Sequence, residues 1–74
     1  MTLDQLPLQK EAMIIKTGGE GPLRLRLLDM GLIRGTRVTV MKMAPMGDPM
    51  EIRLRGYSLT LRREDARNIQ IQIA

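Results

Sequence analysis

The chain has 74 residues, a mass of 8.4 kDa and a formal net charge of +4 at pH 7, which allow one small domain over residues 1–74. It contains no Cys or His, and this excludes disulfide bonds, zinc or iron–sulfur sites built on those residues, and thiol or imidazole catalysis. No segment reaches the roughly 20 apolar residues of a membrane helix, and the start of the chain lacks the apolar block of a secretory signal. We therefore expect a soluble intracellular domain with an aliphatic core and no direct membrane insertion.

A short helical turn is predicted at the start of the chain. Thr2 and Gln5 have the spacing of a capping box, in which each side chain bonds the backbone N–H of the other residue. Pro7 disfavours helical geometry at the residue before it, so the helix is limited to about one turn. We expect this turn to cover one end of the core, with Leu3 and Leu6 facing inward.

Residues 11–17 are predicted to form the first strand, and a glycine-rich segment at 18–21 follows it. Both faces of the strand carry apolar side chains, so the pattern does not define the inward face. Phosphate-binding loops occur between a strand and a helix, but this segment lacks their Gly-Lys-Ser/Thr ending, and Pro22 removes one backbone N–H. A flexible turn is therefore favoured over a phosphate site.

A helix is predicted between Pro22 and Gly31, because Pro favours the first helical turn and Gly the position just after the last. Leu23, Leu27 and Met30 recur at helical spacing, with another leucine beside them. The apolar arc is broad. We expect one side of the helix to be buried and another to be only partly covered.

Residues 36–43 alternate as a strand, with Val38 and Val40 on one face. The segment 45–49 is a loop, in which Pro45 suits the second position of a turn and Gly47 the fourth.

A β-hairpin is predicted around residues 56–57, because Gly at the first central position favours a type II′ turn. Counting outward from this loop pairs Leu54 with Leu59. The same register pairs Glu51 with Arg62, and every apolar residue then meets an apolar partner on the same face.

The last elements are a helical turn at 63–67 and a strand at 68–74, with Ile69, Ile71 and Ile73 inward. The predicted fold class is therefore mainly β, with five short strands. One α-helix lies between the first two strands, and a helical turn precedes the last. So few residues favour a small, strongly bent SH3-like barrel, since closure also protects strand edges.

The residues that could carry chemistry form no catalytic or metal-binding pattern. Ser58 is the only serine, and no His can activate it. Glu64 and Asp65 are adjacent, and on a short turn their side chains diverge. Asp29 and Asp48 could in principle bind a hard metal, but no two acids show ligand spacing, and the second suits a turn. We expect no enzymatic activity and no cofactor, and we assign no residue as a metal ligand; whether iron binds directly is not defined by the sequence.

Nine arginines raise the possibility of nucleic-acid binding, because basic patches are the usual footprint of such proteins. Single-strand binding normally needs aromatic stacking platforms, and Tyr57 is the only aromatic residue. An acidic protein surface or the cytoplasmic side of a membrane-bound partner explains the charge at least as well. Seven methionines, several of them around the 45–49 loop, suit either an adaptable partner surface or core filling.

Three segments resemble the FeoA (ferrous iron transport protein A) family: residues 26–32 (RLLDMGL) with Gly35, residues 44–49 (APMGDP), and residues 56–66 (GYSLTLRREDA). Together the matching blocks span about residues 12–71. Two departures stand out. The family often has Pro where Arg34 stands, which leaves that turn geometry open. It also has Gly around residues 8–10, which leaves the entry into the first strand open.

The resemblance implies an SH3-like barrel with an added helix. It also implies a cytoplasmic accessory protein that acts on the membrane permease FeoB, which carries a GTP-binding domain, and that is recruited by it to the inner face of the membrane. No catalytic residue comes with the family. The alternatives are a regulatory module acting with a metal-dependent repressor, as the same barrel occurs in such proteins, or a small nucleic-acid-binding barrel. The oligomeric state is not defined.

From the helix and the loop after the second strand we predict an apolar docking patch for the permease, with two arginines at its rim. Core packing is the alternative role for Leu27 and Met30. The predicted patch comprises Leu27, Met30, Leu32, Pro45 and Met46, with Arg26 and Arg34 at the rim.

Overall fold

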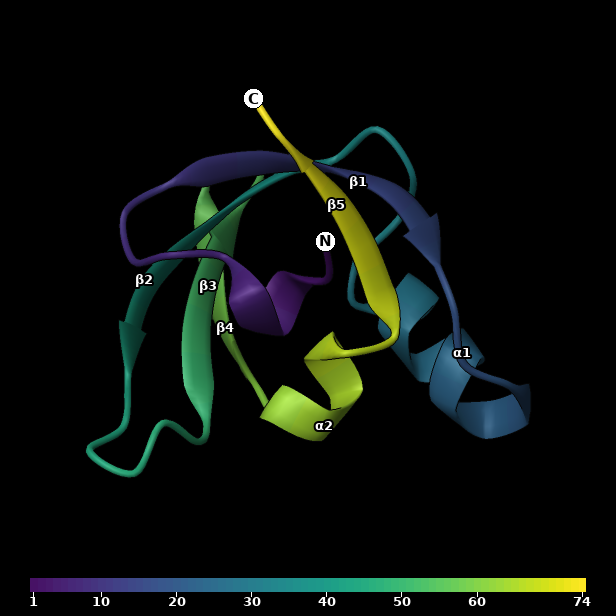
Figure 1. Cartoon of the computed structure of the whole chain (residues 1–74). Helices are drawn as coiled ribbons and strands as arrows, with labels where there is room; N and C mark the ends of the chain where they lie inside the picture. Colours follow the sequence, from purple (N-terminus) through teal and green to yellow (C-terminus); the bar gives the residue numbers. More distant parts are fainter.

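The computed structural model describes residues 1–74, and its five strands form one antiparallel sheet in the order β4-β3-β2-β1-β5 (Figure 1). The strands are β1 (Glu11–Thr17), β2 (Arg37–Met43), β3 (Met50–Leu54), β4 (Tyr57–Leu61) and β5 (Ile69–Ile73). The helical elements are the 3₁₀ turn η1 (Leu3–Gln5), α1 (Gly21–Asp29) and α2 (Arg63–Ala66). The predicted class and element order are therefore confirmed. No helix of the chain combines the length and the apolar character of a membrane span.

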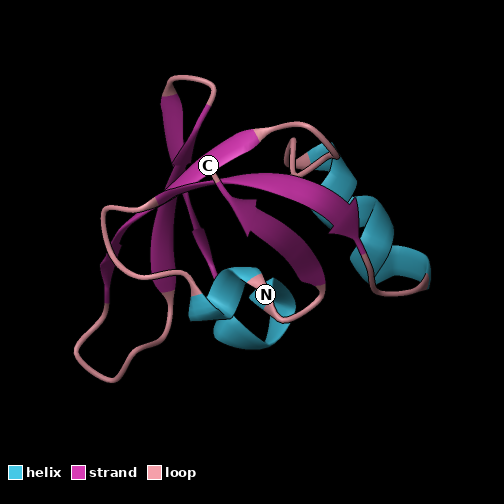
Figure 2. Ribbon diagram, turned by 45° about the horizontal axis from the view of Figure 1, so that its top comes forward, coloured by secondary structure: helices cyan, strands magenta, loops and turns pink.

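The sheet is strongly bent, and η1 and α2 lie together on its concave side, whereas α1 projects at one end (Figure 2). Inside the bend lies one aliphatic cluster of 15 buried residues, to which all five strands and every helical element contribute. Because the chain has no Phe or Trp, Leu, Ile and Val fill most of this space.

The turn at the start of the chain covers the core as predicted. Leu3 and Leu6 are buried, and the capping box is present, with the Gln5 side chain accepting from the Thr2 N–H at 3.1 Å. The same segment also contacts β5, because the Met1 carbonyl accepts from the Ile71 N–H at 2.9 Å. The start of the chain therefore protects both the core and one edge of the sheet.

A β-bulge in β1 explains why its sequence shows no clean alternation. Ala12, Ile14 and Thr17 are buried, and the register with β5 shifts between Ile14 and Lys16. The extra residue moves the inward position from 16 to 17, which keeps the Lys16 side chain exposed.

At the two positions that depart from the family pattern, the backbone has the geometry that the family's residues, Gly near position 9 and Pro at position 34, would favour. Gln9 has a φ of +67°, a conformation that favours glycine, and its main-chain and side-chain N–H groups donate to Val40 and Met41 carbonyls at 2.8 and 2.9 Å. Arg34 occupies the second position of a turn closed by the Thr36 N–H to the Ile33 carbonyl, with Gly35 at φ +88°. This is the arrangement of a type II turn, where Pro suits the second position.

The hairpin register differs from the predicted one. The loop consists of Arg55 and Gly56, with φ of +50° and +83°, and Leu54 therefore pairs with Tyr57 instead of Leu59. Positive φ at both central positions is the signature of a type I′ turn, whose twist matches that of the strands. The predicted and observed pairings differ by two residues, so the same side chains face the core in both.

One further expectation is wrong at the end of β5. Ile69 and Ile71 are buried as predicted, but Ile73 is 48% exposed. It pairs with Ala12 at the end of an edge strand, beyond the point where Met1 contacts β5, so its side chain is only half covered.

Candidate protein-docking face

The C-terminal end of α1 is fixed by a Schellman motif. The Gly31 N–H donates to the Leu28 carbonyl at 3.0 Å, and the Leu32 N–H donates to the Leu27 carbonyl at 3.1 Å. This geometry turns Leu27 and Leu32 toward the core, where both side chains are 0% exposed. The prediction that these two residues belong to the docking patch is therefore wrong, and the alternative role of Leu27, core packing, is confirmed.

Met30 lies half-buried at the end of α1 and contacts the β3–β4 hairpin through Tyr57. The Tyr57 hydroxyl donates to the Met30 carbonyl at 2.5 Å, which satisfies a backbone group that the helix end leaves free. At Gly31 a Cβ atom would lie 3.0 Å from that hydroxyl, and φ there is +90°. Sequence reasoning missed this role of Tyr57; the signal was a lone aromatic residue beside a hairpin loop.

An ion pair joins α1 to α2. Arg26 Nη2 lies 2.9 Å from Asp65 Oδ2, and the Arg26 side chain remains largely exposed. Between these helices and β4 lies an open depression of about 570 Å³, which we call the seam depression. Two arginines and two carboxylates are among its lining residues, which are Arg26, Met30, Pro49, Thr60, Leu61, Arg62, Glu64 and Asp65.

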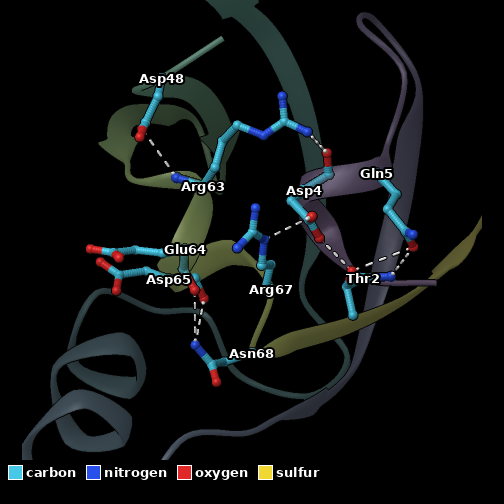
Figure 3. Close-up of polar contacts among 9 residues, drawn as sticks. All are labelled: Thr2, Asp4, Gln5, Asp48, Arg63, Glu64, Asp65, Arg67 and Asn68. Carbon is cyan, nitrogen blue, oxygen red and sulfur yellow. Dashed lines mark hydrogen bonds and ion pairs between the residues drawn. The ribbon is translucent and has the colours of Figure 1, made fainter.

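The loop after β2 has the predicted turn. The Gly47 N–H donates to the Ala44 carbonyl at 2.7 Å, which places Pro45 at the second position. Asp48 Oδ1 accepts from the Arg63 N–H at 3.1 Å and so ties the loop to the start of α2 (Figure 3). Met46, at the tip of this anchored loop, is 91% exposed. The role of Asp48 is thus a contact within the fold.

Further polar contacts hold α2 against the start of the chain (Figure 3). Arg67 Nε lies 3.6 Å from Asp4 Oδ2, and Arg63 Nη2 donates to the Asp4 carbonyl at 3.4 Å. The Asn68 side chain donates to the Glu64 carbonyl at 3.1 Å. No three carboxylates gather as possible metal ligands. The loop is therefore anchored to α2, and α2 is in turn held against the start of the chain.

The exposed members of the predicted patch lie along one continuous surface, with one exception. Pro49 and Thr60 border both the seam depression and a second hollow that Pro45 lines. We therefore define the docking face as Arg26, Met30, Pro45, Met46 and Pro49. Arg34 lies outside it, in a separate hollow that Lys16 and Arg24 also line.

Comparison with known proteins identifies relatives along almost the whole chain. A model of the FeoA domain family matches residues 1–73. A Porphyromonas gingivalis protein named as a fusion of Fe(2+) transport protein A and the Fe(2+) transporter FeoB is 38% identical over 73 residues. That match covers 99% of this chain but only 9% of the relative's length.

Solved structures show the same fold. The FeoA-like protein from Clostridium acetobutylicum superposes with a TM-score of 0.91 at 37% identity, covering 99% of this chain and 85% of that one. Zinc-complexed FeoA from Stenotrophomonas maltophilia, described as an SH3 domain protein, has a TM-score of 0.86 at 24% identity, covering 97% of this chain and 89% of that one. The chain therefore has an SH3-like fold, and it belongs to the FeoA domain family.

Proposed function

We propose that this chain is a non-enzymatic accessory module of ferrous iron uptake that docks onto the cytoplasmic part of an FeoB-type GTP-binding permease. The observation that carries this proposal is the fused relative, in which a homologous domain and an FeoB transporter share one polypeptide. A covalent link raises the effective concentration of two domains for each other. Such a fusion is therefore expected for domains whose function requires that they bind each other. By the same reasoning, we expect the chain to act in the cytoplasm, beside the permease.

The docking face supports this proposal through its combination of exposure and rigidity. Met46 is 91% exposed, yet its loop is closed by a turn and anchored to α2 by Asp48. A large apolar side chain presented on a fixed loop gains free energy when a partner covers it, and methionine adapts to irregular surfaces. The chain also lacks His and Cys, and Ser58 is its only serine, which supports action by contact and not by catalysis.

The test compares two exposed apolar residues, one on the docking face and one outside it. Met46→Gln removes the apolar tip of the loop, whereas Leu25→Gln changes a 61% exposed residue of α1 that lies outside the docking face. Titration calorimetry with the purified cytoplasmic part of the permease should show about 5- to 30-fold weaker binding for Met46→Gln. Leu25→Gln should bind like the wild type, and both variants should keep the wild-type unfolding midpoint.

Two results would contradict this proposal. If the wild-type chain shows no binding to the permease fragment, the function itself is wrong. If Leu25→Gln weakens binding as much as Met46→Gln does, the partner uses another surface and the docking face is wrong.

One observation favours the rival function, nucleic-acid binding. Lys16, Arg24 and Arg34 line one hollow of about 600 Å³ without a carboxylate, and none of the three forms an ion pair. Tyr57, the only aromatic residue, is not part of that hollow. Titration with single-stranded RNA at several salt concentrations separates the two functions, because phosphate binding weakens linearly in a log–log plot against salt.

A further inference from the structure

The outer edge of β4 has free backbone hydrogen-bonding groups. The hairpin loop of two residues makes Leu54 and Tyr57 the first hydrogen-bonded pair, and such pairs alternate along an antiparallel ladder. Ser58 and Thr60 therefore direct their N–H and C=O groups away from β3. β4 has no second neighbour in the sheet, and no hydrogen bond connects these outward groups to another part of the chain.

The sequence of this edge does nothing to discourage pairing. Residues 57–61 read YSLTL, with no charge, no Pro and no Gly. Natural proteins usually protect an exposed edge with a charged residue, a proline, a bulge or a covering segment. β4 lacks the first two, pairs with β3 without a register shift, and is not covered by another strand.

The seam depression lies directly beside this edge, because Thr60 lines it. Its lining also includes Met30, whose carbonyl accepts from the Tyr57 hydroxyl, and the Arg26–Asp65 ion pair. Thr60 and Leu61 of β4, and Arg62 directly after it, form one side of the depression. An added strand could therefore place alternate side chains in the depression while its backbone pairs with β4.

We propose that an extended segment of the permease's cytoplasmic part pairs with the outer edge of β4 as a sixth strand. This inference rests on the proposed function and specifies the mode of binding. The segment alternates apolar and polar residues, so that its apolar side chains meet Met30 and Pro49, which line the depression. It carries a carboxylate near Arg62, which has no ion-pair partner within the chain.

A second copy of the chain fits this edge less well. Arg55 precedes β4 and Arg62 follows it, and neither forms an ion pair, whereas Asp65 near the second of these ends is paired with Arg26. Antiparallel pairing of two copies would bring Arg55 of one chain close to Arg62 of the other, and facing like charges disfavour a strand pair. A segment flanked by acidic residues has the opposite, favourable arrangement.

The first test measures amide hydrogen exchange of the wild-type chain, free and bound to the cytoplasmic part of the permease. The Ser58 and Thr60 amides should exchange at least tenfold more slowly in the complex. A complex in which these two amides remain unprotected overturns the inference and leaves the proposed function intact. Absence of any complex overturns both. Concentration-dependent protection of the same amides in the chain alone identifies a second copy as the occupant and also overturns it.

The second test removes one outward N–H. Thr60→Pro abolishes this donor at an edge position that proline can occupy, whereas the control Thr60→Val keeps the N–H and a similar β-branched shape. Thr60→Pro should bind the permease fragment at least tenfold more weakly, and Thr60→Val should bind like the wild type. Equal affinity of a folded Thr60→Pro variant and the control overturns the inference. Should Thr60→Pro fail to fold, the amide exchange of the wild type decides.

Discussion

The sheet ends in two edges that the chain treats in opposite ways. At β5 the start of the chain covers the edge: Thr2 bridges to Gln70, and Met1 accepts from the Ile71 N–H. At β4 the outward groups of Ser58 and Thr60 have no partner in the chain. The covered edge should therefore contribute mainly to the stability of the domain, and the free edge mainly to binding.

The largest effect is expected at the covered edge, from Leu3→Ala. Leu3 is the first residue of η1 and its side chain is completely buried in the core, and truncating such a leucine costs about 2–5 kcal/mol of unfolding free energy. Urea unfolding measures the change. The control Leu25→Ala, at an exposed position of α1, should stay within about 0.5 kcal/mol of the wild type. A loss below 1 kcal/mol for Leu3→Ala, on the order of a surface change, would mean that the cover is not structural.

A smaller effect is expected from Asp4→Ala, which weakens the attachment of η1 to the rest of the fold but removes no core side chain. The Asp4 carboxylate accepts from the Thr2 hydroxyl and pairs with Arg67, so loss of this hydrogen bond and ion pair should cost about 1–2 kcal/mol. Asp4→Asn keeps the hydrogen-bond acceptor and removes the charge, so it should lose less. Chemical unfolding of both variants gives the comparison, and equal losses would assign the whole effect to the charge.

The smallest effect is expected beside the free edge, from Tyr57→Phe. This change removes one hydrogen bond to the Met30 carbonyl at a partly exposed site, worth about 0.5–1.5 kcal/mol. Thermal unfolding should show a modest decrease in midpoint, and the fold should be retained. A loss as large as that of Leu3→Ala would break the contrast between the edges, because the free edge would then be equally important for stability.

Alternation in the sequence was sufficient to predict the class, the element order and the inward face of most strands. It could not define the hairpin register, because pairings that differ by two residues place the same side chains on the same face. The turn decides between them, and Arg55 adopts a positive φ that its residue type gives no reason to expect. The bulge in β1 has a different cause: it moves the inward position by one residue and so breaks the alternation, and only the pairing with β5 shows where it lies.

The part of the candidate site that lies in a turn could be predicted from the sequence. Met46 and Pro45 lie in a turn, and turns lie at the surface, so their exposure followed from the sequence. Leu27 and Leu32 are apolar residues at the end of a helix, and only the tertiary fold shows that the core, and not a partner, covers them. The Tyr57–Met30 hydrogen bond joins residues 27 positions apart and was likewise outside local reasoning.

The contact between Met1 and β5 has a consequence for how this domain can be built into longer polypeptides. Met1 lies beside Ile71, and both chain ends are near β5 (Figure 1). A linker attached at either terminus would thus leave the domain at the β5 edge of the sheet, and β4 forms the opposite edge. Such a connection would leave the backbone of β4 unobstructed, so covalent joining to a transporter and non-covalent capture of its strand are compatible in one molecule.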